Sequence, residues 1–299
     1  MMDFVKRLEE IAGAANIKLE EPMKNHTTFR IGGPARYFVT PETTDALILV
    51  IGLCRGEEKP FAVIGNGSNL LVSDQGYQGV VISTEKLDHC QAEGERIRVG
   101  AGVKLARMAK LALEQGLTGL EFAAGIPGTV GGALVMNAGA YGSEMKDVLV
   151  SAVLLTKDGA VIRRTGEELE LGYRTSNIPT EGLTVLEAEF QLKPGEKTEI
   201  LQVMNDLAAK RREKQPLEYP SAGSTFKRPE GYFAGKLIDD AGLRGFQVGG
   251  AQVSEKHCGF VINRDQATAA DVEELCRQVA EKVKEQSGVD LEMEIKRLG

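Results

Sequence analysis

Two glycine-rich segments are candidates for ligand binding by the backbone rather than by side chains. Residues 65–69 (GNGSN) directly follow the apolar run 61–64, which predicts a buried strand. The spacing matches the first two glycines of a dinucleotide-binding fingerprint, but Leu70 stands where its third glycine would be, and no clear helix begins after Ser68. The segment therefore predicts either a turn whose N–H groups surround an anion such as pyrophosphate, or an ordinary turn between strands.

The second segment runs from residues 125–132 (GIPGTVGG) to residues 137–142 (NAGAYG). Glycine makes up 35 of the 299 residues, about 12% against a usual ~7%, and six of these glycines lie between Gly125 and Gly142. Such small residues cannot fill a core, but they let backbone approach a flat ligand and donate from many N–H groups. Close packing between two sheets is the alternative, and the length and density of the run favour a ligand.

Other chemistries find little support. The segment 231–237 lacks the spacing and the Ser or Thr of a phosphate-binding Walker loop. The three histidines and the four cysteines show no metal-ligand spacing, so we expect no metal site and a reducing compartment.

A net charge of −7 argues against nucleic acid as a partner, and the basic run 210–214 reads as the end of a helix. No apolar run approaches the ~18 residues of a membrane span, and residues 4–11 predict an amphipathic helix rather than a signal peptide. We therefore expect a cytoplasmic protein that does not bind membranes.

The elements that must position these segments alternate strands with a few helices. Residues 61–64, 79–83, 96–99 and 184–192 predict strands, and residues 148–164 predict a hairpin that turns at Lys157-Asp158-Gly159. A helix that contains Leu105 and Met108 should stop at Gly116. After a boundary near residues 193–195, we predict helices at 200–215, at 235–242 and after the capping box that Thr268 and Asp271 would form. Strands are expected at 259–262 and 291–296. The class is α+β, with a larger domain at residues 1–195 and a smaller one at 196–299.

Six short blocks, in order along nearly the whole chain, carry a resemblance to a known family. They are residues 29–35 (FRIGGPA), 65–71 (GNGSNLL), 125–132 (GIPGTVGG), 136–142 (MNAGAYG), 173–176 (YRTS) and 222–227 (AGSTFK). Each is weak alone, but together they resemble UDP-N-acetylenolpyruvoylglucosamine reductase. The segment between Arg174 and Phe190 is short, which resembles the subgroup without an extra substrate-covering loop. The resemblance implies a two-lobed FAD-binding domain of the vanillyl-alcohol-oxidase type followed by a substrate-binding domain.

The resemblance also implies an activity and its partners. Hydride from NADPH would pass through FAD to the enolpyruvyl ether of a UDP-sugar, which gives UDP-N-acetylmuramate for peptidoglycan. It implies no obligate protein partner. A flavin oxidase or dehydrogenase of the same superfamily is one alternative, although His26 and His89 lie outside the glycine loops and do not suggest a covalent flavin. A non-catalytic flavin or UDP-sugar sensor is another, and a sensor would not need a proton donor.

The resemblance assigns site residues by position. The expected cofactor-binding residues are Gly65, Asn66, Gly67, Ser68, Asn69, Leu70, Gly125, Ile126, Pro127, Gly128, Thr129, Val130, Gly131, Gly132, Asn137, Gly139, Ala140 and Tyr141. The expected catalytic set is Arg174, Ser224 and Glu294, of which Glu294 has the loosest match, with Glu292 two residues away. Read singly, each of the three could be an ordinary surface or turn residue. Arg174 suits the substrate carboxylate because its charge is permanent and its fork planar, Ser224 would protonate C2, and Lys227 and Arg228 are candidates for the UDP phosphates.

Overall fold

The computed structural model describes the backbone of residues 2–299 and the side chains of residues 4–299. Spatial contacts divide the chain into two compact units, each of which is made of three chain segments. Unit 1 contains residues 1–19, 37–66 and 79–210. Unit 2 contains residues 20–36, 67–78 and 211–299. The assignment of residues 1–195 to cofactor and 196–299 to substrate stays a prediction.

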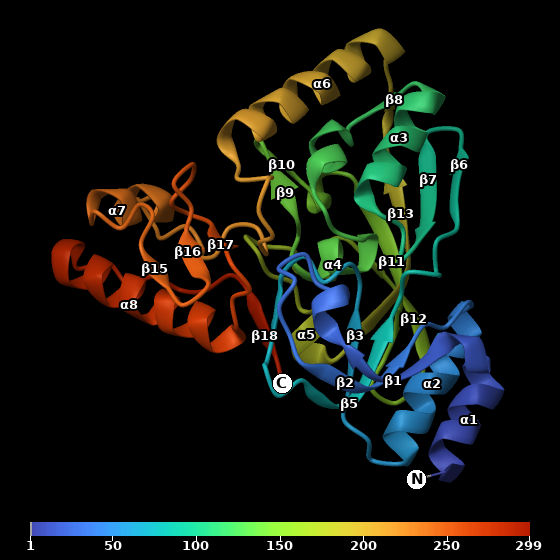
Figure 1. Cartoon of the computed structure of the whole chain (residues 1–299). Coiled ribbons are helices and arrows are strands. Elements are labelled where there is room, and N and C mark those ends of the chain that lie inside the picture. The colour runs from blue at the N-terminus through green and yellow to red at the C-terminus, as the bar shows by residue number, and fades with distance from the viewer. Residues whose placement is uncertain (1) are drawn as a thin grey trace. The chain divides into compact units, whose positions relative to one another are not determined.

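An antiparallel five-stranded sheet forms the centre of unit 1 (Figure 1). Its order is β12-β11-β13-β7-β6. The bounds are β6 Cys90–Glu93, β7 Arg96–Gly100, β11 Leu149–Leu155, β12 Val161–Thr165 and β13 Thr184–Gln191. One face carries buried Ile97, Val99, Ala188 and Phe190, which belong to the same core as the apolar side of helix α3 (Leu105–Gln115). The predicted strands 96–99 and 184–192 and the hairpin 148–164 are therefore confirmed.

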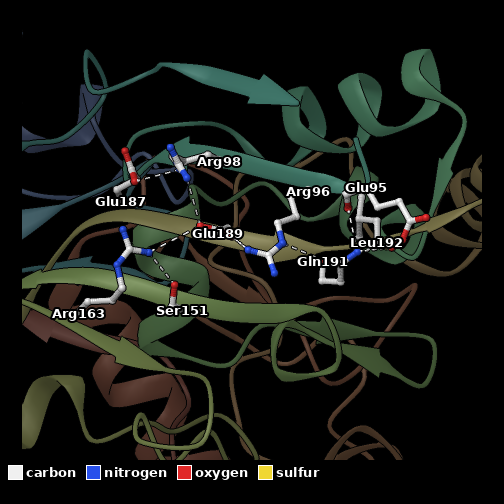
Figure 2. A network of polar contacts seen from close by, with 9 residues as sticks. All are labelled: Glu95, Arg96, Arg98, Ser151, Arg163, Glu187, Glu189, Gln191 and Leu192. Atoms are coloured by element: carbon white, nitrogen blue, oxygen red, sulfur yellow. Dashed lines mark hydrogen bonds and ion pairs between the residues drawn. The ribbon is translucent and has the colours of Figure 1, made fainter. Parts of the chain in front are cut away.

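Part of the opposite face of this sheet is polar, and Figure 2 shows three arginines that converge on Glu189 of β13. Arg96 donates to Glu189 Oε1 at 2.6 Å, while Arg98 and Arg163 lie 3.5 and 3.7 Å from Oε2. The Glu189 side chain is only 7% exposed. Because a buried carboxylate is costly unless it is paired, the arginines make this position in the sheet tolerable. Arg163 also donates to Ser151 Oγ at 2.9 Å.

Unit 1 also holds a second core around two helices, α1 (Met2–Ala12) and α2 (Thr44–Gly56). Phe4 and Leu8 of α1 pack in the same core as Leu47 and Ile51 of α2. The adjoining sheet has the order β1-β2-β5-β3, in which β3 and β5 run parallel. Its bounds are β1 Ile17–Pro22, β2 Pro34–Val39, β3 Phe61–Ile64 and β5 Tyr77–Ser83. Residues 20–22, 34–36 and 77–78 of these strands are assigned to unit 2. The predicted strands 61–64 and 79–83 are confirmed.

The remaining elements of unit 1 are mostly short. Helix α3 ends at Gly116, whose φ of 68° is the left-handed C-cap that the sequence predicted. The long helix α6 ends at Lys214, before Pro216, as expected. The other bounds are α4 Val130–Val135, α5 Ile178–Glu181, α6 Lys197–Lys214, β8 Leu117–Thr118, β9 Gly139–Ala140, β10 Ser143–Glu144 and β14 Lys193–Pro194.

Unit 2 packs helix α8 (Ala269–Ser287) against a small antiparallel sheet of order β15-β16-β17. The predicted capping box is present, because Thr268 Oγ1 accepts from Asp271 N at 3.0 Å and Asp271 Oδ2 accepts from Thr268 N at 2.9 Å. The other bounds are α7 Ala234–Asp240, β4 Leu70–Val72, β15 Gln247–Val248, β16 Ala251–Val253, β17 Val261–Asn263 and β18 Lys296–Leu298.

The last strand differs from the expectation. The predicted strand 291–296 is wrong, because the regular strand β18 begins only at Lys296, where it pairs in parallel with β4. Residues 292–294 instead contact residues 225–227 through the isolated antiparallel bridge of Phe226 with Met293. The strand shifts because its partner is the short β4.

Candidate active site

The two glycine-rich segments meet in unit 1. Gly65 directly follows β3, and Asn66 Nδ2 donates to Pro127 O at 2.6 Å. A Cβ atom on Gly65 would overlap Thr129 Oγ1 and would lie 3.1 Å from Thr129 Cβ. Only glycine fits at this approach, so the contact between the segments explains the residue type at position 65.

On one side, the segment that contains Thr129 forms backbone hydrogen bonds with residues 101–105. Val130 N donates to Val103 O at 2.9 Å, and Gly131 N donates to Ala101 O at 2.9 Å. A Cβ atom on Gly131 would lie 3.2 Å from Ala101 Cβ, so this glycine is close to protein. Gly132 differs, because it is exposed and a Cβ atom there would have Thr129 Oγ1 as its nearest neighbour, at 3.9 Å. Gly131 therefore faces the protein interior at Ala101, whereas Gly132 has open space beside its Cα atom.

Thr129 carries a buried polar atom that the surrounding protein leaves without a hydrogen bond. The residue is 3% exposed, and its Oγ1 finds no hydrogen-bond partner among the residues that the structure describes. An unsatisfied buried hydroxyl costs about 1–3 kcal/mol. The hydroxyl stands at the junction of the two glycine segments, next to Gly65 and Gly132. The Thr129 hydroxyl and the open backbone at Gly132 fit a large cofactor with polar edges, such as FAD.

The next segment, residues 136–142, contains β9 and the turn that leads to its partner strand β10 at residues 143–144. Asn137 is completely buried, whereas Tyr141 is 50% exposed and its hydroxyl donates to Leu207 O at 3.4 Å. Both have positive φ values, 40° and 56°, which few non-glycine residues adopt. Gly139 and Ala140 are partly exposed within the hairpin.

Arg174 lies in a tight turn of unit 1. Gly172 and Thr175 exchange backbone hydrogen bonds of 3.1 and 3.4 Å, which closes the turn around Tyr173 and Arg174. Arg174 has a φ of 54°, its Nη2 donates to Gly139 O at 3.1 Å, and its guanidinium carbon lies 5.2 Å from the Tyr173 ring centre. The structure thus brings Arg174 to the hairpin that carries three of the predicted cofactor residues.

Ser224 lies in unit 2 beside a fixed neighbour. Thr225 is fully buried: its N donates to Gly259 O and its O accepts from Glu294 N, both at 2.8 Å. Thr225 Oγ1 accepts from Val261 N at 2.8 Å. Ser224 itself is exposed and follows Gly223, whose φ is 79°. Its hydroxyl therefore sits at the surface of unit 2, next to a backbone position held at three points.

Glu294 meets both the Ser224 segment and the first glycine loop. Besides its bond to Thr225, the Glu294 carbonyl accepts from Asn69 Nδ2 at 3.2 Å. Lys227 N donates to Glu292 O at 2.8 Å, and the Lys227 ammonium forms an ion pair with the Glu292 carboxylate. The structure therefore brings Ser224 and Glu294 onto neighbouring segments of unit 2. Arg174 belongs to unit 1, and the three-residue set stays a prediction.

The other predicted residues of unit 2 have partners of their own. Arg228 stacks on Phe233, with 3.8 Å from its guanidinium carbon to the ring centre. Gly67 has a φ of 59°, and a Cβ atom there would overlap His26 O. Contacts within unit 2 therefore explain why this position is glycine. Sequence reasoning missed Thr225 and the contact of Asn69 with Glu294. No local signal marks them, because these pairs are far apart in the chain.

Thiol chemistry finds no support at this site. Burial raises the pKa of Cys54 to about 12, of Cys276 to about 12 and of Cys258 to about 11, and it also raises the pKa of Cys90. These free thiols are therefore protonated at neutral pH and are poor nucleophiles. Among residues with described side chains, no cluster of His, Cys, Asp or Glu could hold a metal ion. No described helix is long and apolar enough to cross a membrane.

Comparison with known proteins places these features in a family. Residues 35–165 match the family model of an FAD binding domain, and residues 215–298 match the C-terminal domain of UDP-N-acetylenolpyruvoylglucosamine reductase. The reductase of that name from Agathobacter rectalis is 53% identical, with 99% of this chain and 98% of that protein covered. The reductase from Geobacillus kaustophilus is 51% identical over 98% and 97% of the two chains.

Solved structures agree with this placement. The crystal structure of UDP-N-acetylenolpyruvylglucosamine reductase from Thermus caldophilus is 39% identical, covers 95% of this chain and 98% of its own, and gives a TM-score of 0.80. A glucose oxidase variant of Phl p 4 is 14% identical, covers 65% of this chain and 44% of its own, and gives a TM-score of 0.53, which shows a shared fold alone. The expected class, α+β with an FAD-binding domain of the vanillyl-alcohol-oxidase type, is confirmed. On the identity and near-complete coverage of these relatives, the chain belongs to the UDP-N-acetylenolpyruvoylglucosamine reductase family.

Proposed function

We propose that this protein reduces the enolpyruvyl group of UDP-N-acetylenolpyruvoylglucosamine to give UDP-N-acetylmuramate, with NADPH as the hydride donor and FAD as the resident cofactor. The observation that carries the proposal is the junction of the two glycine segments around the unpartnered Thr129 hydroxyl. It lies in a chain about half identical to named reductases. The free cysteines suit the reducing cytosol, where we place the reaction.

Thr129 and Gly132 would contact FAD most directly, since one offers a buried hydroxyl and the other an open backbone surface. Asn66 would keep the two segments together through Pro127. FAD, when bound, supplies two-electron chemistry between NADPH and the C3 atom of the enolpyruvyl group. Gly131 would have a different task from Gly132, because its N–H donates to Ala101 O and a Cβ atom there would lie 3.2 Å from Ala101 Cβ.

Arg174 would bind the carboxylate of the substrate, on which negative charge builds as C3 gains hydride. Arginine suits this task because it remains charged and presents several N–H donors in one plane. Its Nη2 bond to Gly139 O and its stacking on Tyr173 restrict the guanidinium before substrate arrives. A charge that is already oriented stabilises a transition state better than one that must reorient during the reaction.

Ser224 would donate the proton to C2, and Glu294 would orient or polarise the carboxylate of the substrate. The exposed position of Ser224 suits a group that must reach a ligand, while the triple anchoring of Thr225 limits its movement. Lys227 and Arg228 are candidates for the UDP phosphates. Glu292 already pairs with Lys227, so phosphate binding would compete with that ion pair.

A single anaerobic experiment tests the proposal. The purified protein should be yellow, NADPH should bleach the flavin absorbance, and the enolpyruvyl substrate should restore it. Recovery only on admission of oxygen would instead indicate an oxidase. A flavin that NADPH does not reduce would exclude NADPH as the donor, and a protein that takes up no FAD would refute the proposal as a whole.

A further inference from the structure

Asn137 is a polar side chain that protein atoms enclose completely. It is 0% exposed, and its Nδ2 donates to Glu144 Oε2 at 2.9 Å and to Gly172 O at 3.0 Å. Its Oδ1 accepts from Lys146 N at 3.0 Å. An asparagine amide has two N–H donors and one carbonyl, so each of these groups is engaged inside unit 1. The side chain is therefore engaged by contacts within the protein, and the predicted cofactor contact of Asn137 would have to come from its backbone.

These contacts hold the turn that carries Arg174. Gly172 is the first residue of that turn, and its carbonyl accepts from Asn137 Nδ2 as well as from Thr175 N. Beyond the other end of the turn, Ser176 Oγ donates to Val135 O at 2.8 Å. Both ends are thus tied to the segment 135–137 by buried side chains.

Asn137 also holds the partner of the Arg174 guanidinium. Arg174 Nη2 donates to Gly139 O, and Gly139 pairs with Glu144 across the β9–β10 hairpin. Glu144 is the carboxylate that accepts from Asn137. One amide therefore fixes the backbone of Arg174 through Gly172 and the acceptor of its side chain through Glu144. We infer that Asn137 is the positioning residue for Arg174, an inference that rests on the proposed role of Arg174 toward the substrate carboxylate.

The backbone of the turn makes such a support necessary. Arg174 has a φ of 54°, a left-handed conformation that is unfavourable for a long side chain. Strained conformations of this kind persist where surrounding contacts over-determine them. Without the Asn137 amide, the turn can relax and the guanidinium loses its fixed direction.

A double-mutant cycle tests the inference. Asn137 has a φ of 40°, so Asn137→Gly removes the side chain without straining the backbone. Anaerobic stopped-flow should show that Asn137→Gly slows flavin reoxidation by the substrate about 10- to 100-fold, because small misplacements of catalytic groups have effects of this size. NADPH should still reduce the flavin at nearly the wild-type rate. In the Arg174→Ala background, adding Asn137→Gly should have no further effect, since coupled residues are not additive.

A matched control separates this role from a loss of stability. Asn263 is also buried, and its amide donates to Phe29 O at 3.1 Å and accepts from Ala267 N at 2.8 Å. Asn263→Ala should lower the urea midpoint and leave reoxidation by substrate unchanged. Calorimetric titration with UDP-N-acetylmuramate gives a readout without turnover: Asn137→Gly should weaken binding in the wild-type background and not in the Arg174→Ala background.

Two different results would overturn the inference. If Asn137→Gly slows reoxidation by the same factor with and without Arg174, Asn137 does not act through Arg174, while the proposed role of Arg174 stands. If Arg174→Ala alone reoxidises at the wild-type rate, the role of Arg174 and the inference fail together. If Asn137→Gly does not fold, the same cycle can be measured with Ser176→Ala at the other end of the turn. We expect Ser176→Ala to slow flavin reoxidation by a smaller factor, and a wild-type reoxidation rate would refute the inference.

Discussion

Replacement of Thr129 by valine should raise the free energy of unfolding of the FAD-free protein and should weaken its binding of FAD. Threonine and valine have nearly the same shape, so the substitution exchanges the unpartnered hydroxyl for a methyl group and little else. An unsatisfied buried hydroxyl costs about 1–3 kcal/mol. We therefore expect the free energy of unfolding of the FAD-free protein to rise by about 1 kcal/mol or more. Most substitutions in a protein core instead lower the free energy of unfolding.

FAD binding should respond the other way. If the hydroxyl makes one hydrogen bond to the cofactor, valine loses about 0.5–1.5 kcal/mol of binding, which is roughly a 2- to 13-fold increase in Kd. Urea unfolding of the FAD-free protein gives the first quantity, and a titration that follows flavin fluorescence gives the second.

Thr84 provides the matched control for this experiment. It is 4% exposed, and its Oγ1 donates to Ile64 O at 3.2 Å, so its hydroxyl is satisfied. Thr84→Val should lower the free energy of unfolding by about 1 kcal/mol. If Thr129→Val destabilises the FAD-free protein as much as Thr84→Val does, the Thr129 hydroxyl is already satisfied and the fit to the cofactor loses its main support.

Four further substitutions test other parts of the site and the fold. Gly132→Val should weaken FAD binding while leaving the FAD-free protein about as stable, whereas Gly131→Val should lower stability first because it crowds Ala101; equal effects of the two in urea unfolding would contradict this difference. Ser224→Ala should bleach normally with NADPH but reoxidise at least about a hundredfold more slowly with substrate, and a near wild-type rate in stopped-flow would show that the proton comes from elsewhere. Hydrogen bonds from the Thr268 and Gly250 backbones lower the pKa of Asp271 below its ordinary 3.8, so this carboxylate stabilises the fold above that value and the contribution is lost as pH falls through the lowered pKa. Asp271→Asn should cost up to about 1 kcal/mol at pH 7, with a deficit that shrinks in acid; a deficit independent of pH in urea unfolding would exclude the charge as its cause.

Local signals in the sequence predicted the parts of the fold that depend on neighbouring residues. Gly116 ends α3 and Thr268 begins α8, and both act within a single helical turn. Helix α2 goes unpredicted, although Thr43 caps it and Leu47 and Ile51 have helical spacing. The final strand was misplaced for a different reason, since its bounds depend on pairing with β4, more than two hundred residues earlier.

The site divides in the same way. The density of glycine marks the two glycine segments in the sequence, whereas residues 173–176 (YRTS) and 222–227 (AGSTFK) stand out only through the resemblance to the family. The sequence does not show that Asn66 donates to Pro127 O or that Gly131 N donates to Ala101 O, since both contacts join segments that are far apart in the chain. Nor does the resemblance distinguish Gly131 from Gly132, although their surroundings differ.

The arginine cluster on Glu189 implies an unequal tolerance to mutation. Loss of Arg96, Arg98 or Arg163 leaves the buried carboxylate with two remaining cations, so each arginine is partly redundant. Loss of Glu189 removes the counter-charge that Arg96 and Arg98 of β7 share with Arg163 of β12, so all three arginines lose this partner at once. In a library of random substitutions, the arginine positions should accept many replacements, whereas position 189 should accept few until one of the arginines has already been lost.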